Sequence, residues 1–343
     1  MRSIRLLLSR SGCCRAVLTL CAVWSLGPEA RAIVLYSNAT GNTTAPASAE
    51  GLDGWNLQAT FGNFFVTPIA GQYFIAAQHI YAAPSSSGYS GPTSVTLNSV
   101  AYPLDLSFNG GLGCANDPGS DLRIYKIQGT FPAWAPLYTS ADGPELGKTA
   151  TMMGMGAVRG TDVVDTAAGY NLVRGWQWGA NRAASWGQNV VSGYDDYSAG
   201  SPDSLLRFNF DSKGIDNEGA LSVGDSSGGV FILSGGQWKL AGVNYAMDSP
   251  WSTTGTGTRS NGFNADIFDS RGLYQWDGSS WVYNDPRLLA PIPTAGYASR
   301  ISDRADWIAS VVPEPGTLGL LVVLAPVMLL LACIHVKGRH HPR

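Results

Sequence analysis

The residues of this chain best suited to chemistry are a serine in a glycine-rich turn and a single central histidine. Ser226 lies in Gly224-Asp225-Ser226-Ser227-Gly228-Gly229-Val230-Phe231, where glycines let the backbone turn sharply and direct two N–H groups toward one point. Such a pair of donors can stabilise an oxyanion. His79 is the one histidine between the two ends of the chain, so acid–base chemistry near neutral pH depends mainly on it. The hypothesis is nucleophilic catalysis at a serine; an ordinary turn and a structural histidine are the alternatives.

The elements that must position these residues read as short β-strands. Apolar runs broken by Gly, Pro, Asn or Ser recur along the chain, as expected for antiparallel strands in a sandwich or barrel. The expected strands are 63–66, 72–76, 94–97, 122–127, 150–153, 205–210, 229–233 and 238–243. Residues 275–283 read as a hairpin around an Asp-Gly turn. The one convincing helix is Ser302–Ser310, with Ser302 as its N-cap.

Composition excludes several classes of function. The net charge is -3, and no basic patch is available to neutralise phosphates, so nucleic acid is not expected as a partner. Cys114 is the one cysteine between the terminal segments, so no disulfide can form within that part of the chain. One histidine and one cysteine do not suit a zinc site of the usual kinds. No cofactor or metal is expected, although the loop acids Asp195 and Asp196 leave calcium binding open.

The first 32 residues have the organisation of a signal peptide. A basic start is followed by the apolar run 16–26, and Ala30-Arg31-Ala32 offers the small residues that signal peptidase accepts. The apolar run is too short to span a bilayer, which argues against an N-terminal anchor. Cleavage after Ala32 is expected. A lipoprotein signal at Cys21 is disfavoured because Leu20 is too large for the preceding position.

The last residues, 312–343, contain a second targeting segment. Residues 317–334 carry no charge and are long enough for a transmembrane helix, and the basic residues after them are expected to stay cytoplasmic. Pro313-Glu314-Pro315 stands just before, and prolines favour an extended backbone there. This layout resembles the PEP-CTERM sorting signal of Gram-negative bacteria. The resemblance implies processing by an exosortase and release toward the cell surface; a permanent single-span anchor is the alternative.

Five segments between residues 33 and 311 resemble the trypsin-like serine peptidases, which have the chymotrypsin fold. The run from Gly224 to Phe231 resembles that family's Gly-Asp-Ser-Gly-Gly-Pro block, and the run ending Ala76-Ala77-Gln78-His79 resembles its Ala-Ala-His strand. The other three matches are 121–127, 237–243 and 297–308. The resemblance implies an all-β domain of two antiparallel six-stranded barrels with a short C-terminal helix.

The same resemblance assigns roles to individual residues. Ser226 is expected to be the nucleophile, His79 the base and Asp121 the acid that orients the imidazole. The N–H groups of Gly224 and Ser226 are expected to form the oxyanion hole. The alternatives are Ser227 for the nucleophile and Asp105 or Asp117 for the acid.

The resemblance also implies a substrate pocket and an activation device. Ala220, Met247 and Gly296 are expected at the pocket, and an apolar pocket without a carboxylate disfavours Lys and Arg. Signal-peptide cleavage would leave Ile33 as a free N-terminus. In the family, such an N-terminus pairs with the acid before the nucleophile, which here is Asp225.

Some features depart from the family. Gln78 replaces a small residue, Ser227 replaces the glycine after the nucleophile, and Ile80 replaces a cysteine. Residues 248–293 are much longer than the usual loop and read as an insertion, either packed beside the cleft or a surface hairpin without a role in recognition.

The function expected from these observations is that of an exported serine endopeptidase with a preference for apolar side chains before the cleaved bond. Its partners would be a protein or peptide substrate, signal peptidase, exosortase and, through the C-terminal helix, the inner membrane. Two other classes remain: a surface binding or adhesion protein that has kept the triad without activity, and a structural protein of an exopolysaccharide matrix.

Overall fold

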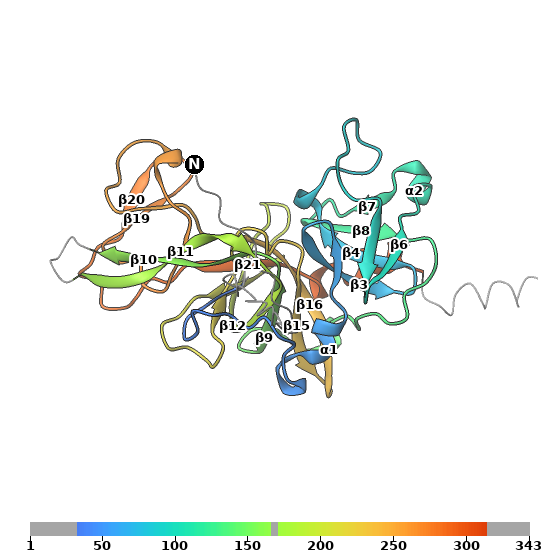
Figure 1. Ribbon diagram of the computed structural model, residues 1–343, viewed down its shortest axis with the longest axis horizontal. Helices are drawn as coiled ribbons and strands as arrows, with labels where there is room; N and C mark the ends of the chain where they lie inside the picture. Colours follow the sequence, from blue (N-terminus) through green and yellow to red (C-terminus); the bar gives the residue numbers. More distant parts are fainter. Residues whose placement is uncertain (1–32, 166–170, 314–343) are drawn as a thin grey trace, which may run out of the picture.

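A computed structural model describes residues 33–165 and 171–313, and these residues are mostly β (Figure 1). The predicted signal peptide, residues 1–32, and the predicted membrane segment, residues 317–334, lie outside the described residues. Within residues 33–165 and 171–313, no helix has the length and apolar character needed to cross a membrane.

The N-terminal half is an antiparallel seven-stranded sheet in the order β6-β5-β2-β3-β4-β8-β7. Its strands are β2 (Ala59–Phe61), β3 (Phe64–Ala70), β4 (Tyr73–Ala77), β5 (Ser94–Leu97), β6 (Val100–Pro103), β7 (Cys114–Asn116) and β8 (Leu122–Lys126). The sheet curls around an aromatic core in which the rings of Phe74 and Tyr125 stack with centroids 5.0 Å apart. One isolated bridge, between Leu104 and Ile127, joins the end of β6 to the end of β8.

The C-terminal half is a closed six-stranded barrel in the order β12-β13-β21-β16-β15-β9. Its strands are β9 (Thr149–Gly154), β12 (Ser185–Asp195), β13 (Leu205–Asn209), β15 (Gly229–Ser234), β16 (Gln237–Met247) and β21 (Ala295–Arg300). The predicted pair of six-stranded barrels is therefore corrected to one closed barrel and one seven-stranded sheet. Beside the bridge, the N–H of Asp105 donates to the carbonyl oxygen of Lys126 and the N–H of Gln128 donates to that of Pro103, so the ends of β6 and β8 meet over a short stretch.

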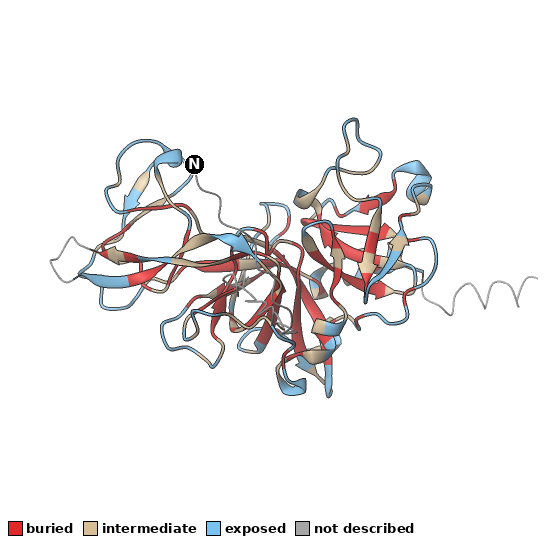
Figure 2. Ribbon diagram, viewed as in Figure 1, coloured by how far each residue is buried: buried red, intermediate tan, exposed pale blue. Residues whose placement is uncertain are grey.

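The two halves pack against each other and against the C-terminal helix. Buried side chains from both contribute to one core, for example Ile75 and Leu122 from the sheet and Phe231 and Leu240 from the barrel (Figure 2). The helix α3 (Ala305–Val311) buries Ile308 in this core. Two shorter helices, α1 (Leu52–Asn56) and α2 (Phe108–Gly111), lie in loops.

The predicted N-cap of the last helix is corrected. Residues Ser302–Arg304 form a 3₁₀ turn, and α3 begins after it. The Ser302 hydroxyl donates a hydrogen bond to the buried carboxylate of Glu145, which also pairs with Arg300. Because a buried carboxylate needs partners, this contact takes the hydroxyl away from the helix end.

A third layer extends from the barrel and holds the insertion. The long hairpin of β10 (Ala157–Asp165) and β11 (Leu172–Arg182) pairs with β18 (Ala265–Ile267) from the insertion. The strands β17 (Trp251–Ser252), β19 (Tyr274–Trp276) and β20 (Trp281–Tyr283) form a small sheet, which includes the predicted hairpin. A separate core joins hairpin and insertion through Val163, Trp251, Ala265, Ile267 and Leu273. The insertion is thus packed onto the β10–β11 hairpin.

Near the start of the described chain, a short strand β1 (Val34–Leu35) pairs with β14 (Gly219–Ala220). Ile33, Val34 and Leu35 are each about 1% exposed, so this segment is fully inserted into the barrel side of the molecule.

Candidate active site

His79 and Asp121 meet because their strands are neighbours. His79 lies in the turn after β4, and Asp121 comes directly before β8, which pairs with β4 through Ala77 and Leu122. The imidazole Nδ1 lies 2.5 Å from the Asp121 carboxylate, and the His79 backbone N–H donates to the same carboxylate at 3.2 Å. Asp121 is buried, whereas the imidazole is partly open to solvent. The carboxylate therefore holds the ring in one orientation with its Nε2 free for another partner.

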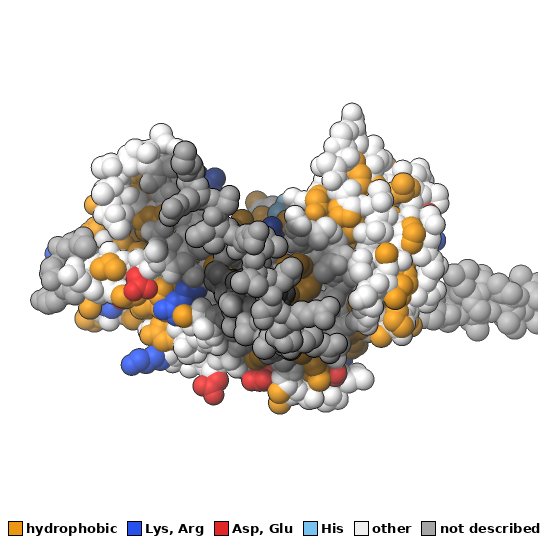
Figure 3. Space-filling view, viewed as in Figure 1, with side chains coloured by type: hydrophobic (Ala, Val, Ile, Leu, Met, Phe, Trp, Pro, Cys, Tyr) orange, Lys and Arg blue, Asp and Glu red, His pale blue; other side chains and the backbone are white. Residues whose placement is uncertain are grey.

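That partner is Ser226, which comes from the other half of the molecule. Its hydroxyl lies 2.8 Å from Nε2 of His79. Serine hydroxyl, imidazole and carboxylate thus form a continuous hydrogen-bonded chain across the junction of sheet and barrel. The space-filling view shows the surface hollowed between the lobe that carries β19 and β20 and the N-terminal half (Figure 3).

The alternative acids lie elsewhere. Asp117 accepts hydrogen bonds from Ser120 and Gly119 and lies near Arg304. Asp105 accepts from Ser107 and pairs with Lys126 at 3.2 Å. Neither carboxylate contacts His79.

Gln78 was noted in the sequence as a departure, and the structure gives its side chain a positioning role. Its amide nitrogen lies 2.7, 2.9 and 3.0 Å from the carbonyl oxygens of Asp117, Ser120 and Leu122. These carbonyls belong to the loop that carries Asp121. Gln78 therefore ties the acid to the turn that holds His79.

Ser227, the alternative nucleophile, is buried and points away from the imidazole. Its hydroxyl accepts a hydrogen bond of 3.0 Å from the backbone N–H of Ala77, at the end of β4. Its φ is +71°, a value that serine adopts at some cost and that glycine adopts freely. The hydroxyl compensates for that cost by joining the nucleophile turn to the strand that precedes His79.

Gly224 is required by its conformation and by its neighbour. Its φ is +96°, and a Cβ placed there would lie 2.1 Å from the guanidinium of Arg182. Arg182 donates to the carbonyl oxygens of Gly224, Asn63 and Met155 at 3.0–3.1 Å and so holds the turn from outside. The N–H groups of Gly224 and Ser226 donate to no other group in the described parts of the chain. They are therefore available to an oxyanion.

Asp225 lies completely buried beneath this turn. Its carboxylate accepts hydrogen bonds from the N–H of Gly156 at 2.7 Å and from the N–H and hydroxyl of Ser222 at 2.7 and 2.9 Å. Burial raises the pKa of Asp225 to about 6, while these bonds and one from the backbone N–H of Ile33 lower it. The structure thus brings the two residues of the predicted activation pair together.

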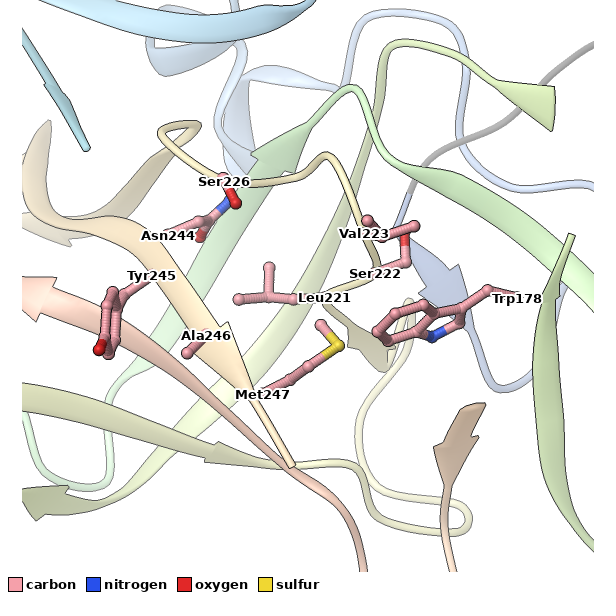
Figure 4. A pocket seen from close by; sticks show the side chains of 9 residues that line it. All are labelled: Trp178, Leu221, Ser222, Val223, Ser226, Asn244, Tyr245, Ala246 and Met247. Atoms are coloured by element: carbon pink, nitrogen blue, oxygen red, sulfur yellow. The ribbon is translucent and has the colours of Figure 1, made fainter. Parts of the chain in front are cut away.

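A pocket opens beside Ser226, with a volume of about 130 Å³ (Figure 4). It is lined by Trp178, Leu221, Ser222, Val223, Ser226, Asn244, Tyr245, Ala246 and Met247. Of the three predicted pocket residues, Met247 lines it. Ala220 instead pairs with Val34 and packs against Trp176 and Phe210, so its neighbour Leu221 faces the cavity. Gly296 does not line the pocket. It pairs with Met247 between β16 and β21, and a Cβ added to it would lie 3.5 Å from the side chain of Leu221.

The pocket contains a residue that the sequence analysis missed. Trp178 comes from β11, in a hairpin that no local pattern had singled out.

No group of three or more metal-ligating side chains occurs within residues 33–165 and 171–313. Asp195 lies 3.6 Å from Arg207, and Asp196 accepts from the N–H of Asp203. Both loop acids thus have partners within the chain.

Compared with known proteins, the chain matches no family model and no curated sequence. The geometry of its own residues is therefore the basis for any functional conclusion.

Proposed function

We propose that the chain is a serine endopeptidase with the two-lobed architecture of trypsin-like enzymes. The observation that carries this proposal is the continuous relay of Ser226, His79 and Asp121, with contacts of 2.8 and 2.5 Å. The relay joins residues from the two halves of the molecule, which is how that family assembles its site. The seven-stranded sheet, whose β6 and β8 meet only at their ends, is a difference from the family's paired barrels.

The relay supports acyl transfer in two steps. Ser226 Oγ attacks the substrate carbonyl while His79 Nε2 takes its proton, and Asp121 stabilises the imidazolium. The N–H groups of Gly224 and Ser226 stabilise the oxyanion. The imidazolium then protonates the leaving amine, and an acyl-enzyme forms. Water, deprotonated by the same imidazole, hydrolyses the ester and restores the Ser226 hydroxyl.

The pocket favours apolar side chains before the cleaved bond. Its lining includes the apolar side chains of Leu221, Val223, Met247 and Trp178, and none of its lining residues is acidic. A Lys or Arg side chain would have no anionic partner there and would lose its hydration. Proteins or peptides with apolar residues at this position are the proposed substrates.

Removal of residues 1–32 is proposed as the activating step. The buried segment Ile33–Leu35 and the hydrogen bond from Ile33 to Asp225 support it. Ile33 has a φ of +39°, which is strained for a β-branched residue. A free N-terminus has no φ, so cleavage would remove this strain and place an ammonium beside a buried carboxylate. Mass spectrometry that finds the mature protein starting anywhere but Ile33 would exclude this step.

The proposed location follows from the two terminal segments. The signal peptide would direct export and be removed by signal peptidase, the 317–334 helix would anchor the chain in the inner membrane, and exosortase would then release it to the cell surface. Cell fractionation with and without a Pro313→Ala, Pro315→Ala double substitution tests the last step. Unchanged release from the membrane would count against it.

Labelling with a fluorophosphonate tests the proposed activity directly. The wild-type chain should be labelled, and the Ser226→Ala and His79→Ala variants should not. Ser227→Ala, which changes the adjacent serine, is the matched control and should still be labelled. Labelling that depends on Ser227 and survives Ser226→Ala would overturn the assignment. A folded wild-type chain that is never labelled would instead favour the binding or adhesion protein.

A further inference from the structure

One wall of the pocket beside Ser226 comes from outside the barrel. Trp178 reaches the pocket from β11, on the side away from Ser226, and Met247 lies on that far side too (Figure 4). The strand β11 pairs with β18 of the insertion through Gln177 and Ala265. The backbone N–H of Trp178 donates to the carbonyl oxygen of Asn264, which also belongs to the insertion. The hairpin and the insertion therefore jointly fix the position of this indole.

Behind the indole lies a carboxylate that has no cationic partner among the described residues. Asp266, on β18, is fully buried and accepts a hydrogen bond of 3.0 Å from the indole N–H of Trp178. Its other oxygen has no hydrogen-bond partner within residues 33–165 and 171–313. An unpaired buried acid destabilises a fold, so a position that keeps one is unusual.

The surroundings of Asp266 favour the neutral form of its carboxyl group. Burial raises its pKa well above the usual value, and the nearby Asp225 carboxylate raises it further, whereas the Trp178 hydrogen bond lowers it. Access of water or of a cation to this carboxyl would reverse the effect of burial. Trp178 contacts both, because its indole N–H donates to Asp266 and the same residue lines the pocket.

The pocket volume limits what fits while the indole is in place. About 130 Å³ is slightly below the roughly 150 Å³ of an apolar protein cavity that holds benzene. A leucine or methionine side chain, or the single ring of phenylalanine, is of this size. The bicyclic indole of tryptophan is larger.

We propose that Trp178 determines the substrate specificity of the proposed peptidase by covering Asp266, and that Asp266 positions the indole. The inference rests on the proposed function, and it specifies the substrates as peptides with leucine, methionine or phenylalanine before the cleaved bond. Behind Trp178, this pocket then has a concealed carboxyl group. Loss of the indole converts an apolar pocket into one that binds cations.

The first experiment measures kcat/KM for peptide substrates that differ only in the residue before the cleaved bond. With Trp178→Ala, the ratio for lysine over leucine should rise about tenfold or more, and tryptophan should become acceptable. Adding Asp266→Asn should abolish the gain for lysine and leave the gain for tryptophan. Asp266→Asn alone keeps an acceptor for the indole N–H and should preserve the wild-type preference.

Trp176→Ala is the matched control. This indole lies on the same strand, is buried, packs against Tyr36, Phe210 and Phe268, and has no hydrogen-bond partner for its N–H in the described chain. Its loss should reduce stability without changing the order of preferred substrates. An unchanged order in Trp178→Ala, or the same change in Trp176→Ala, would overturn the inference.

A second experiment does not depend on catalysis. In a Ser226→Ala background, binding of benzamidine, an aromatic amidinium cation, is measured by calorimetry. No binding is expected with Trp178 present, binding is expected with Trp178→Ala, and none with Trp178→Ala combined with Asp266→Asn. Absence of binding to folded Trp178→Ala refutes the inference even if the enzyme is active. Absence of fluorophosphonate labelling in the wild type refutes the proposed function and leaves this result intact.

Discussion

Substitution of Asp225 by asparagine should change the pH dependence of stability in one of two chains that differ by one residue, and not in the other. One chain begins at Ile33 and the other keeps Ala32 before it, each released from a fusion that leaves the intended first residue. In the longer chain the nitrogen of Ile33 is an uncharged amide. In the shorter chain it is an amine that can carry a positive charge beside Asp225.

The magnitude follows from the pKa of Asp225, which burial raises from 3.8 to about 6 in the folded chain. A shift of about two units corresponds to about 3 kcal/mol, at about 1.4 kcal/mol per unit. Because the folded pKa is raised, this contribution to stability is complete below the unfolded pKa and is lost as the pH rises through the folded pKa. In the longer chain, the free energy of unfolding of the parent should therefore fall by about 3 kcal/mol, relative to that of Asp225→Asn, as the pH rises from about 4 to about 7.

The assay is urea unfolding followed by tryptophan fluorescence at a series of pH values, for parent and variant in both chains. The parent–variant difference removes the effect of other buried acids, such as Glu218, whose pKa burial raises to about 7. In the shorter chain the ammonium of Ile33 pairs with the carboxylate, so the loss should be absent. If the difference in free energy of unfolding between parent and variant does not change with pH in the longer chain, the burial of Asp225 is refuted. An equal loss in both chains would show that the amine does not reach it.

Three further substitutions test the hydrogen bonds that hold the site. Gln78→Ala removes the donor to three loop carbonyls and should lower kcat about tenfold with little change in KM. Gln78→Asn should not restore kcat, because its amide is one methylene too short. Full activity in the alanine variant would contradict the positioning role. Ser227→Ala leaves the N–H of Ala77 unpaired and should cost about 1–3 kcal/mol in chemical unfolding, whereas a neutral result would show that the two halves do not depend on this bond. Gly224→Ala puts a side chain at a φ of +96°, which alanine rarely adopts, and should lower kcat by about 100-fold or more while the chain stays folded by circular dichroism. An active variant would mean that the turn is not held as described.

The strands near the catalytic residues could be predicted because each is an apolar run bounded by turn residues. The predicted strand 94–97 coincides with β5, and the predicted 72–76 differs from β4 (Tyr73–Ala77) by one residue. The hairpin β10–β11 was missed because glycine inside a strand reads as a turn. Gly175 is there for another reason: a Cβ would lie 2.1 Å from the carbonyl oxygen of Asp266, so only glycine lets β18 approach.

The contacts that complete the site join residues far apart in the chain, and no local pattern encodes them. The Gln78 amide binds carbonyls of a loop about 40 residues later, so its residue type looked like a mere departure. Trp178 and Asp266 are separated by 88 positions, and each alone is an ordinary residue of an aromatic-rich β protein. The pocket residue was placed at Ala220 instead of Leu221 because neighbouring residues of a strand face opposite sides, and an alignment without structure cannot tell the sides apart.

The union of hairpin and insertion has a consequence for how this protein can evolve. Arg174 of β11 is buried between Asp165 of the hairpin and Asp269 of the insertion, at 3.0 and 2.5 Å. Loss of the insertion would remove one acid from a buried cation and uncover the pocket wall at the same time. The two segments are therefore expected to be inherited or lost as a unit, with correlated substitutions between them. Ser226, His79 and Asp121 lie outside both segments, so descendants could exchange this unit and alter the pocket while the proposed chemistry stays the same.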